Sequence, residues 1–333
     1  MADRVLLAHG SGGKLMHDLI RKYFVAPLDN PILGRLDDAA VFDLKGRLAF
    51  TTDSYVVKPI FFPGGDIGRL AVCGTVNDLA TSGAVPKYLS LSFIIEEGLP
   101  FDDLERVIAS VRATAAEASV RIVTGDTKVV DRGGADRLFI NTAGVGVVPA
   151  GRDISGANAR VGDKVIVSGT LGDHGIAVMS QREGLQFQVP VPSDCAPLNR
   201  MVAAMLRAGD VHSLRDPTRG GLASTLNELA AQSRVGISIE EATIPVNQAV
   251  AGACELLGFD PLYVANEGKM VAIVAPEDAK AMLAATKRNR YGRRAAVIGE
   301  VVREHPGRVV MTTRLGAHRI IDLLSGELLP RIC

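Results

Sequence analysis

The stretch DIGRLAVCGTVNDLATSGAVPKYLSLSFII, residues 66–95, places a helix directly before a strand. Its first part is typical of a helix, with Asp66 as the candidate N-cap and Gly83 as the stop. Residues 87–95, KYLSLSFII, alternate apolar and polar side chains as a half-buried strand does. Asn77 and Asp78 interrupt the apolar helix, and burying such a pair without partners is costly. The stretch therefore predicts a helix beside a sheet, and a polar pair that has partners.

The same mixture of helices and strands continues on both sides of this stretch and predicts an α+β (mixed α/β) fold. In the first half, helices are predicted at residues 14–24 and 101–119, and strands at 39–42, 47–53, 120–126 and 137–148. In the second half, strands are predicted at residues 163–169, 236–240, 269–276 and 294–302, and a turn at 215–221. Helices are predicted there after Asp173, after Asp194, at 222–233 and at 276–288.

The length of 333 residues predicts two hydrophobic cores, because a single core rarely grows beyond about 250 to 300 residues. Composition becomes loop-like near PAGRDISGANARVGD, residues 149–163. We therefore predict an N-terminal domain at 1–155 and a C-terminal α/β sandwich-like domain at 156–324. The last nine residues, SGELLPRIC, follow a Ser-Gly break and predict an extended, flexible tail at 325–333 that carries Cys333.

Charge and composition exclude several classes of function. Lys plus Arg equals Asp plus Glu at 37 each, so bulk charge indicates no nucleic-acid or membrane-surface partner. The apolar runs have the length of strands, and the N-terminus has no signal-peptide pattern, which predicts a soluble cytoplasmic protein. The four cysteines and six histidines are scattered without metal-ligand spacing, which argues against a disulfide framework and a zinc site.

Five short stretches in the first half place polar groups at strand ends or in loops. They are HGSGGK (9–14), LDDAAVF (36–42), TTDS (51–54), VNDLA (76–80) and VTGDTK (123–128). Their carboxylates, Asp37, Asp38, Asp53, Asp78 and Asp126, are the oxygen ligands that Mg²⁺ prefers, often together with phosphate. GSGGK is not a Walker A loop, yet a glycine-rich segment followed by Lys14 and a helix offers amides and a cation to phosphate oxygens.

The ordered series GSGGK, DDAA, TTD, NDLATSGAVPKYLSLS, VTGDTKV, DPTRGGLA, NEGK and terminal PRIC resembles the HypE family of hydrogenase maturation factors. That family belongs to an ATP-binding superfamily with aminoimidazole ribonucleotide synthetase, selenophosphate synthetase and thiamine-monophosphate kinase. The resemblance covers essentially the whole chain, and PRIC at the C-terminus is its most specific element. Leu36 departs from the glycine that many superfamily members have before the two aspartates.

The resemblance implies an ATP-dependent carbamoyl dehydratase. Such proteins carry a carbamoyl group on the C-terminal cysteine, dehydrate it to a thiocyanate, and deliver the cyanide ligand to the iron of [NiFe]-hydrogenase. It implies ATP and Mg²⁺ as cofactors and a homodimer whose two protomers complete a β-barrel, around which the ATP sites are built. It also implies two partners: a carbamoyl transferase that loads Cys333 and an iron-carrying scaffold complex that accepts cyanide.

The resemblance assigns residues to roles by the motifs they occupy. The reactive group is on Cys333, and the proton acceptor is Glu267 or Lys128, a choice that the sequence leaves open. The expected Mg²⁺ ligands are Asp38, Asp53, Asp78 and Asp126. The expected ATP-binding residues are Ser11, Gly12, Gly13, Lys14, Asn77, Gly125 and Thr127. Three further residues, Asp37, Asp216 and Arg219, are possible additions to the site.

Two other classes of function fit parts of the sequence. Another enzyme of the superfamily would explain the ATP motifs but would leave PRIC without a role. Selenophosphate synthetase would further require a cysteine or selenocysteine in the glycine-rich segment, and no cysteine precedes Cys73. A carrier or scaffold that uses Cys333 without catalysis is the non-enzymatic alternative.

Overall fold

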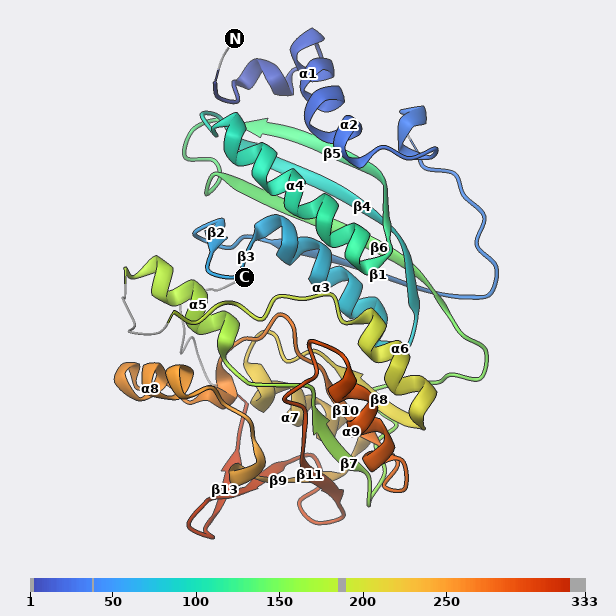
Figure 1. Ribbon diagram of the computed structural model, residues 1–333, viewed down its shortest axis with the longest axis vertical. Coiled ribbons are helices and arrows are strands. Elements are labelled where there is room, and N and C mark those ends of the chain that lie inside the picture. The colour runs from blue at the N-terminus through green and yellow to red at the C-terminus, as the bar shows by residue number, and fades with distance from the viewer. Residues whose placement is uncertain (1–2, 38, 185–189, 324–333) are drawn as a thin grey trace.

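The first half of the chain is built on a four-stranded sheet in the order β1-β6-β4-β5 (Figure 1). The computed structural model describes residues 3–37, 39–184 and 190–323. The strands are β1 (Arg47–Tyr55), β4 (Val85–Glu96), β5 (Arg121–Val130) and β6 (Leu138–Val148). Strand β6 pairs antiparallel with β1 and β4, whereas β5 lies parallel to β4 at the opposite edge from β1.

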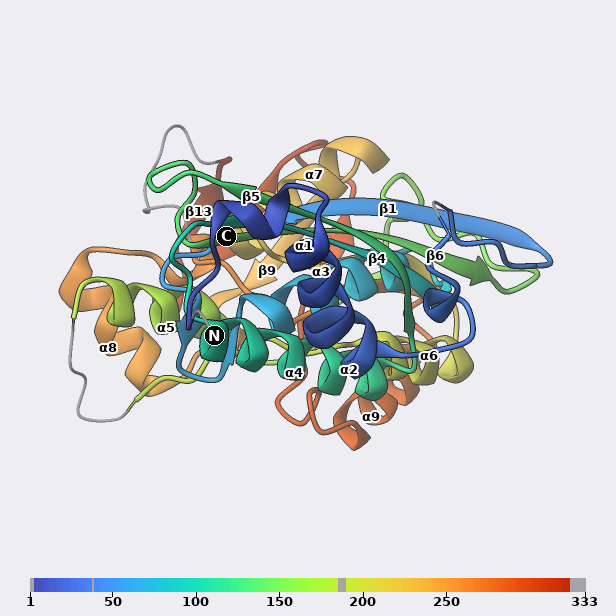
Figure 2. The same ribbon diagram turned by 90° about the horizontal axis from the view of Figure 1, so that it is seen from above.

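Helices α3 (Ile67–Thr81) and α4 (Phe101–Ala118) lie on the same side of this sheet (Figure 2). Asp66 caps α3 as predicted, because its Oδ1 accepts hydrogen bonds from the main-chain nitrogens of Gly68 and Arg69. Gly83 ends the helical segment with a φ of +72°, a conformation that glycine adopts without strain. Apolar side chains of β4 alternate into the core under these helices, as the sequence predicted.

The second half forms a seven-stranded sheet in the order β13-β12-β9-β11-β7-β10-β8. Its strands are β7 (Lys164–Val167), β8 (Val211–Arg215), β9 (Gly236–Glu240), β10 (Val271–Val274), β11 (Ala296–Val302), β12 (Val309–Thr312) and β13 (His318–Ile321). Its helices are α5 (Asp173–Arg182), α6 (Asn199–Ala208), α7 (Gly221–Ser233), α8 (Gln248–Leu257) and α9 (Ala279–Arg288).

Short elements complete the fold. The N-terminal segment contains η1 (Leu7–Gly10), α1 (Lys14–Leu19), η2 (Ile20–Val25), α2 (Ala26–Leu28) and η3 (Leu33–Arg35). Strands β2 (Phe61–Phe62) and β3 (Gly65–Asp66) form a small ribbon, and η4 (Glu241–Thr243) and η5 (Pro261–Tyr263) lie in the second half. No helix of the described residues is long and apolar enough to cross a membrane.

Helix α3 joins the two halves. Its buried residues, such as Val72, share one hydrophobic core with Ile176 and Val264 of the second half. Ala80, near the end of the same helix, packs in a second cluster with Met201 and Met282. The polar groups of α3 are therefore positioned by both halves of the molecule.

The structure confirms an α+β fold and most predicted elements. The strand predicted at 39–42 is wrong: the described residues 39–46 are irregular, and Val41 is 71% exposed. A short apolar run does not form a strand where no neighbouring strand pairs with it. The sequence also missed β8, α8, β12 and β13. The division at residue 155 stays a prediction, and the tail at 325–333 lies outside the described residues.

Candidate functional site

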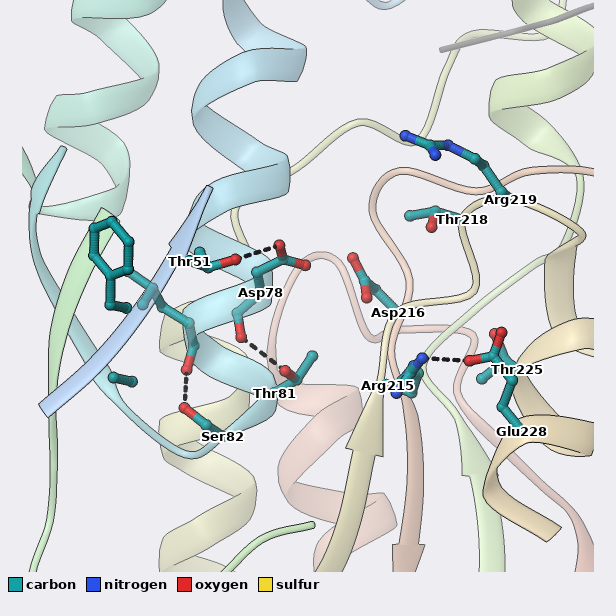
Figure 3. Close-up of a pocket in the computed structure, with 13 residues that line it drawn as sticks. Thr51, Asp78, Thr81, Ser82, Arg215, Asp216, Thr218, Arg219, Thr225 and Glu228 are labelled. Carbon is teal, nitrogen blue, oxygen red and sulfur yellow. Dashed lines mark hydrogen bonds and ion pairs between the residues drawn. The ribbon is translucent and has the colours of Figure 1, made fainter. Parts of the chain in front are cut away.

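A polar cavity of about 530 Å³ lies between the two halves (Figure 3). Asp78 enters it from α3 and Thr51 from β1, whereas Asp216 and Arg219 come from the turn that follows β8. Thr51 and Asp53 lie on the same side of β1, because side chains two residues apart on a strand share a face. The predicted turn RDPTRGG thus adds its side chains to the predicted motifs TTDS and VNDLA.

The carboxyl group of Asp78 is held by β1. Thr51 Oγ1 donates a hydrogen bond of 3.0 Å to Asp78 Oδ2. Burial is the main cause that raises the pKa of Asp78, and the charge of Asp53 raises it further. The Thr51 hydrogen bond and the charge of Arg215 act in the opposite direction.

Asp216 lies opposite Asp78 across the same cavity (Figure 3). Burial, followed by the charge of Asp78 and that of Asp53, raises the pKa of Asp216 to about 7. Arg219 is 3.9 Å from Asp53 by the closest nitrogen and oxygen atoms, and Arg215 forms an ion pair with Glu228. Three carboxyl groups therefore crowd one partly buried region, an arrangement that a cation would stabilise.

Asp126 and Lys128 lie together elsewhere, on β5. Their side chains form an exposed ion pair of 3.1 Å. The register pairs Asp126 with Ser92 on β4, Ser92 with Asn141 on β6, and Asn141 with Ser54 on β1. Because adjacent strands are about 4.8 Å apart, Asp126 is roughly 14 Å from the residue next to Asp53. The sheet of one protomer does not bring Asp53 and Asp126 together.

The glycine-rich segment lies on the Asp126 side of the sheet. Gly10 packs so closely on β5 that an added Cβ would be 2.9 Å from Val129 Cβ. Gly12 has a φ of +80°, Ser11 donates to the carbonyl of Ala8, and Lys14 begins α1. Gly125 has no room for a side chain, because a Cβ would be 2.2 Å from the carbonyl oxygen of Leu91.

A second cavity, of about 520 Å³ and next to β5, brings some of these predicted residues together. Asp37, Gly125, Asp126 and Thr127 lie beside an apolar wall that comes from the N-terminal helical segment and from β4. The predicted site therefore divides into an acidic cavity on β1 and α3 and a second group on β5, which we call the β5 group: residues 11–14, Asp37 and 125–128.

Glu267 belongs to the acidic cavity side. It is 5% exposed, and its main-chain nitrogen donates a hydrogen bond of 3.1 Å to Asp194 Oδ1. Burial and the charge of Asp53 raise the pKa of Tyr55 well above its usual value, and the charge of Glu267 contributes. Tyr55 follows Asp53 by two residues on β1, so the effect of Glu267 on Tyr55 places Glu267 near the β1 side of the sheet. Lys128 is on β5, at the opposite edge, and therefore belongs to the other group.

Known proteins match nearly the whole chain. Residues 36–148 match the N-terminal domain and residues 160–312 the C-terminal domain of the AIR synthase related proteins. A relative from Bradyrhizobium diazoefficiens named carbamoyl dehydratase HypE is 58% identical and covers 98% of this chain and 95% of its own length. The chain belongs to the HypE family.

Solved structures of the HypE family agree in fold. A hydrogenase maturation protein HypE in complex with ATP has a TM-score of 0.96 and 54% identity over 98% of this chain and 99% of its own. The chain of a HypE-HypF complex has a TM-score of 0.82 and 49% identity over 92% of this chain and 99% of its own.

Two residues that the family motifs point to lie outside the described residues: Asp38 and Cys333. Sequence reasoning missed three side chains of the acidic cavity and its surroundings: Thr51, Arg215 and Glu228. Thr51 and Arg215 occur inside the quoted motifs TTDS and RDPTRGG, so proximity to a predicted site residue was the available signal. Glu228 lies inside a regular helix, where no local pattern distinguishes it.

The donors around the acidic cavity fit Mg²⁺ by chemistry. Asp53, Asp78 and Asp216 offer hard carboxylate oxygens, and burial together with the charges of Asp78 and Asp53 raises the pKa of Asp216, a penalty that a divalent cation would relieve. Within the described ranges, no three His, Cys, Asp or Glu side chains are already grouped as a metal site. Mg²⁺ commonly keeps several water ligands, so such a site does not require every carboxylate in direct contact.

Proposed function

We propose that this chain dehydrates a carbamoyl group carried on its own Cys333 to a thiocyanate, using ATP, to supply the cyanide ligand of [NiFe]-hydrogenase. The observation that carries the proposal is the match to a HypE structure with ATP over 98% of the chain. The name of the Bradyrhizobium diazoefficiens relative, carbamoyl dehydratase, points to the same reaction. The location is proposed to be the cytoplasm.

The reaction balances as follows. The carbamoyl oxygen attacks the γ-phosphorus of ATP, ADP leaves, and the oxygen becomes part of a phosphate ester, a far better leaving group than hydroxide. Loss of that phosphate and of both nitrogen-bound protons leaves sulfur bonded to a C≡N group. The products are the thiocyanate, ADP and phosphate, and the oxygen of the removed water ends in the phosphate.

The acidic cavity is proposed to provide metal binding for this reaction. Asp53, Asp78 and Asp216 would hold Mg²⁺, which supplies charge neutralisation at the transferring phosphoryl group. Arg219, beside Asp53, brings a positive charge to the same region. The β5 group is proposed to bind nucleotide phosphates through the amides and side chains of Ser11, Gly12, Gly13, Lys14, Gly125 and Thr127.

Glu267 is the base that the geometry favours. Glu267 is buried, the charges of Glu267 and Asp53 both act on Tyr55, and a desolvated carboxylate is a stronger proton acceptor than one in water. Lys128 is exposed and paired with Asp126, so in its own protomer it stabilises negative charge rather than accepting a proton.

A homodimer is proposed to complete the site. The face of the sheet opposite α3 and α4 carries exposed apolar side chains, including Leu48 (51% exposed) and Phe50 (70% exposed). Two such faces packed together would form the predicted barrel and would allow Asp126 and Lys128 of one protomer to approach the acidic cavity of the other. In this dimer, the β5 group of one protomer would lie next to the acidic cavity of its partner, although the two are apart within one protomer.

The partners are proposed from the same comparisons. The HypE-HypF complex supports a carbamoyl transferase that loads Cys333. The acceptor of cyanide would be an iron-carrying scaffold complex, which follows from the destination of the product.

Intact-mass measurement of the full-length chain tests the reaction. After loading by the carbamoyl transferase, the mass should rise by one carbamoyl group, and Mg²⁺ with ATP should then remove the mass of one water. Cys333→Ser should gain no group, and Glu267→Gln should load but lose no water. A loaded wild-type chain that keeps its full mass with Mg²⁺ and ATP overturns the proposal.

A further inference from the structure

Asn77 lies on α3 immediately before Asp78, and its side chain is 1% exposed. Its Oδ1 accepts a hydrogen bond of 2.8 Å from the main-chain nitrogen of Leu198. Its Nδ2 donates to the carbonyl oxygens of Ala196 at 3.1 Å and of Glu267 at 3.5 Å. Both amide hydrogens are thus used inside the protein, which leaves none for a phosphate oxygen.

The segment that carries Glu267 is fixed on its other side by Asp194. Asp194 Oδ1 accepts from the nitrogen of Glu267, and its Oδ2 is 3.1 Å from Lys269 Nζ. Gly268 packs directly on Asp194, because an added Cβ would be 1.8 Å from the Asp194 carbonyl oxygen. The main chain at 267–269 therefore has little freedom to move relative to the segment 194–198.

The preceding residue extends this attachment to the acidic cavity. The amide of Asn266 accepts from the nitrogen of Gly172 at 2.7 Å and donates to the carbonyl of Pro217 at 3.0 Å. Pro217 follows Asp216 directly, so the hydrogen bond from Asn266 attaches the segment that carries Glu267 next to Asp216. The hydrogen bond from Asn77 attaches the same segment next to Asp78. Both bonds are fully buried.

We propose that Asn77 is a positioning residue for the dehydration, and that it fixes the main chain of Glu267 relative to Asp78. The inference rests on the proposed function, in which Glu267 removes protons while Asp78 holds the metal. On one turn of α3, Asp78 would then hold the metal and Asn77 would hold the main chain of Glu267. The distance between the phosphorylated oxygen and the proton acceptor would therefore be fixed. A displacement of about 1 Å in such an arrangement costs roughly 100-fold in rate.

The test compares Asn77→Ala and Asn77→Ser in the full-length, carbamoyl-loaded chain. Single-turnover loss of water at saturating Mg²⁺ and ATP should fall by about 10-fold to 100-fold in the alanine variant. The serine variant, whose hydroxyl can still donate to one carbonyl, should lie between alanine and wild type. The dissociation constant of ATP with Mg²⁺, measured by calorimetry, should change by less than about twofold, because the amide hydrogens of Asn77 are already used within the protein.

Asn199→Ala is the matched control. Asn199 also joins the second half to the first, because its Nδ2 donates a hydrogen bond of 2.8 Å to the carbonyl of Ala118 on α4. Its loss should lower thermal stability as Asn77→Ala does, yet leave the rate of water loss unchanged. Equal rates in Asn77→Ala and Asn199→Ala overturn the inference.

Two other outcomes also decide the matter. If Asn77→Ala weakens binding of ATP about 10-fold and keeps the saturated rate, Asn77 is a phosphate ligand and the inference is wrong. If the wild-type chain loses no water, the proposed function fails and this inference fails with it. Wild-type turnover that Glu267→Gln abolishes and Asn77→Ala preserves overturns the inference alone.

Discussion

The carboxyl groups of Asp78 and Asp216 face each other across the acidic cavity (Figure 3), and the charge of Asp78 is, after burial, the largest cause of the raised pKa of Asp216. Without a cation, ionising both groups in this partly buried region is unfavourable. With a divalent cation the same closeness becomes the basis of binding. In the proposed Mg²⁺ site, the pair would therefore bind metal at the expense of stability in the metal-free chain.

Asp216→Asn should therefore stabilise the metal-free protein. The pKa of Asp216 rises from 3.8 to about 7 on folding, so the folded state loses stability as pH increases from about 4 through 7. In EDTA at pH 8, the variant should unfold with a free energy about 4 kcal/mol higher than that of wild type, and at pH 4 the two should be nearly equal. Urea unfolding at both pH values measures this difference.

Two further measurements make this prediction specific. Calorimetry should show weaker binding of Mg²⁺ with ATP to Asp216→Asn, because a proposed ligand group has lost its charge. Asp131→Asn, a change at an exposed aspartate, should alter neither stability nor binding. Equal stability of wild type and Asp216→Asn at pH 8 in EDTA would contradict the expectation.

The acidic cavity could be anticipated in part because its members come from motifs at strand ends and from one capped helix. Asp78 and Asp53 are close because α3 packs on the edge of the sheet that contains β1. The pattern of residues 66–95 predicted a helix beside a sheet, but it did not predict which strand the helix would face. The order β1-β6-β4-β5 could not be read from the sequence, since pairing between distant strands is set by the whole sheet. The separation of Asp126 from Asp53 follows from that order.

Local patterns also misled where their tertiary context was absent. Residues 39–42 have apolar side chains, yet no strand adjoins them, and Val41 is exposed. Asn77 was assigned to phosphate because it adjoins Asp78, whereas its bonds to Ala196 and Glu267 depend on contacts 119 and 190 residues away. Contacts at such separations carry no signal in a single sequence.

Gly74→Ala should destabilise the protein although it replaces glycine inside a helix. The new Cβ would be 2.2 Å from the hydroxyl oxygen of Tyr55, whose side chain is 2% exposed and cannot withdraw into solvent. Overpacking of this kind typically costs about 1 to 3 kcal/mol, which exceeds the gain of about 1 kcal/mol from better helix propensity. Thermal or urea unfolding measures the net change.

Gly252→Ala provides the opposite case for comparison. Gly252 lies in α8, and a Cβ there would meet no atom within 4 Å. This variant should gain up to about 1 kcal/mol, so the two substitutions should differ in sign. A stabilised Gly74→Ala protein would show that β1 and α3 can separate more easily than their packing indicates.

His174 should make the protein sensitive to acid. Burial lowers its pKa to about 4, while Nδ1 lies 2.8 Å from Ser193 Oγ. Since the folded pKa is below the unfolded value of 6.5, this stabilisation is complete above pH 6.5 and is lost as pH falls toward 4. The loss amounts to about 3 kcal/mol over that interval.

His174→Gln removes the titrating group and keeps a polar side chain. The variant should be less stable at pH 7, yet its free energy of unfolding should change less between pH 6.5 and 4. His318→Gln, at an exposed position of β13, is the matched control and should keep the wild-type dependence. Parallel pH dependences for wild type and His174→Gln would rule out this source of acid sensitivity.

Phe50→Glu should separate the proposed homodimer. Phe50 is 70% exposed on the face of the sheet that the helices do not cover, and a charge there would oppose packing of two apolar faces. Light scattering should report a monomer, and this is the deciding readout because Phe50 also lines the acidic cavity. ATP hydrolysis by the carbamoyl-loaded chain should be lost as well. Leu256→Glu, at a 76% exposed leucine on α8, should leave both the mass in solution and hydrolysis unchanged.

Mixing two inactive variants tests whether the site is shared between protomers. Asp53→Asn removes a carboxylate from the acidic cavity, and Asp126→Asn removes one from β5, about 14 Å away in the same protomer. If each site combines the acidic cavity of one protomer with the β5 group of the other, a mixed dimer has one intact site. Random mixing should then restore about a quarter of wild-type hydrolysis, because half of the dimers are mixed and half of their sites are intact. Sites contained within one protomer would show no recovery, since every chain in the mixture lacks one carboxylate.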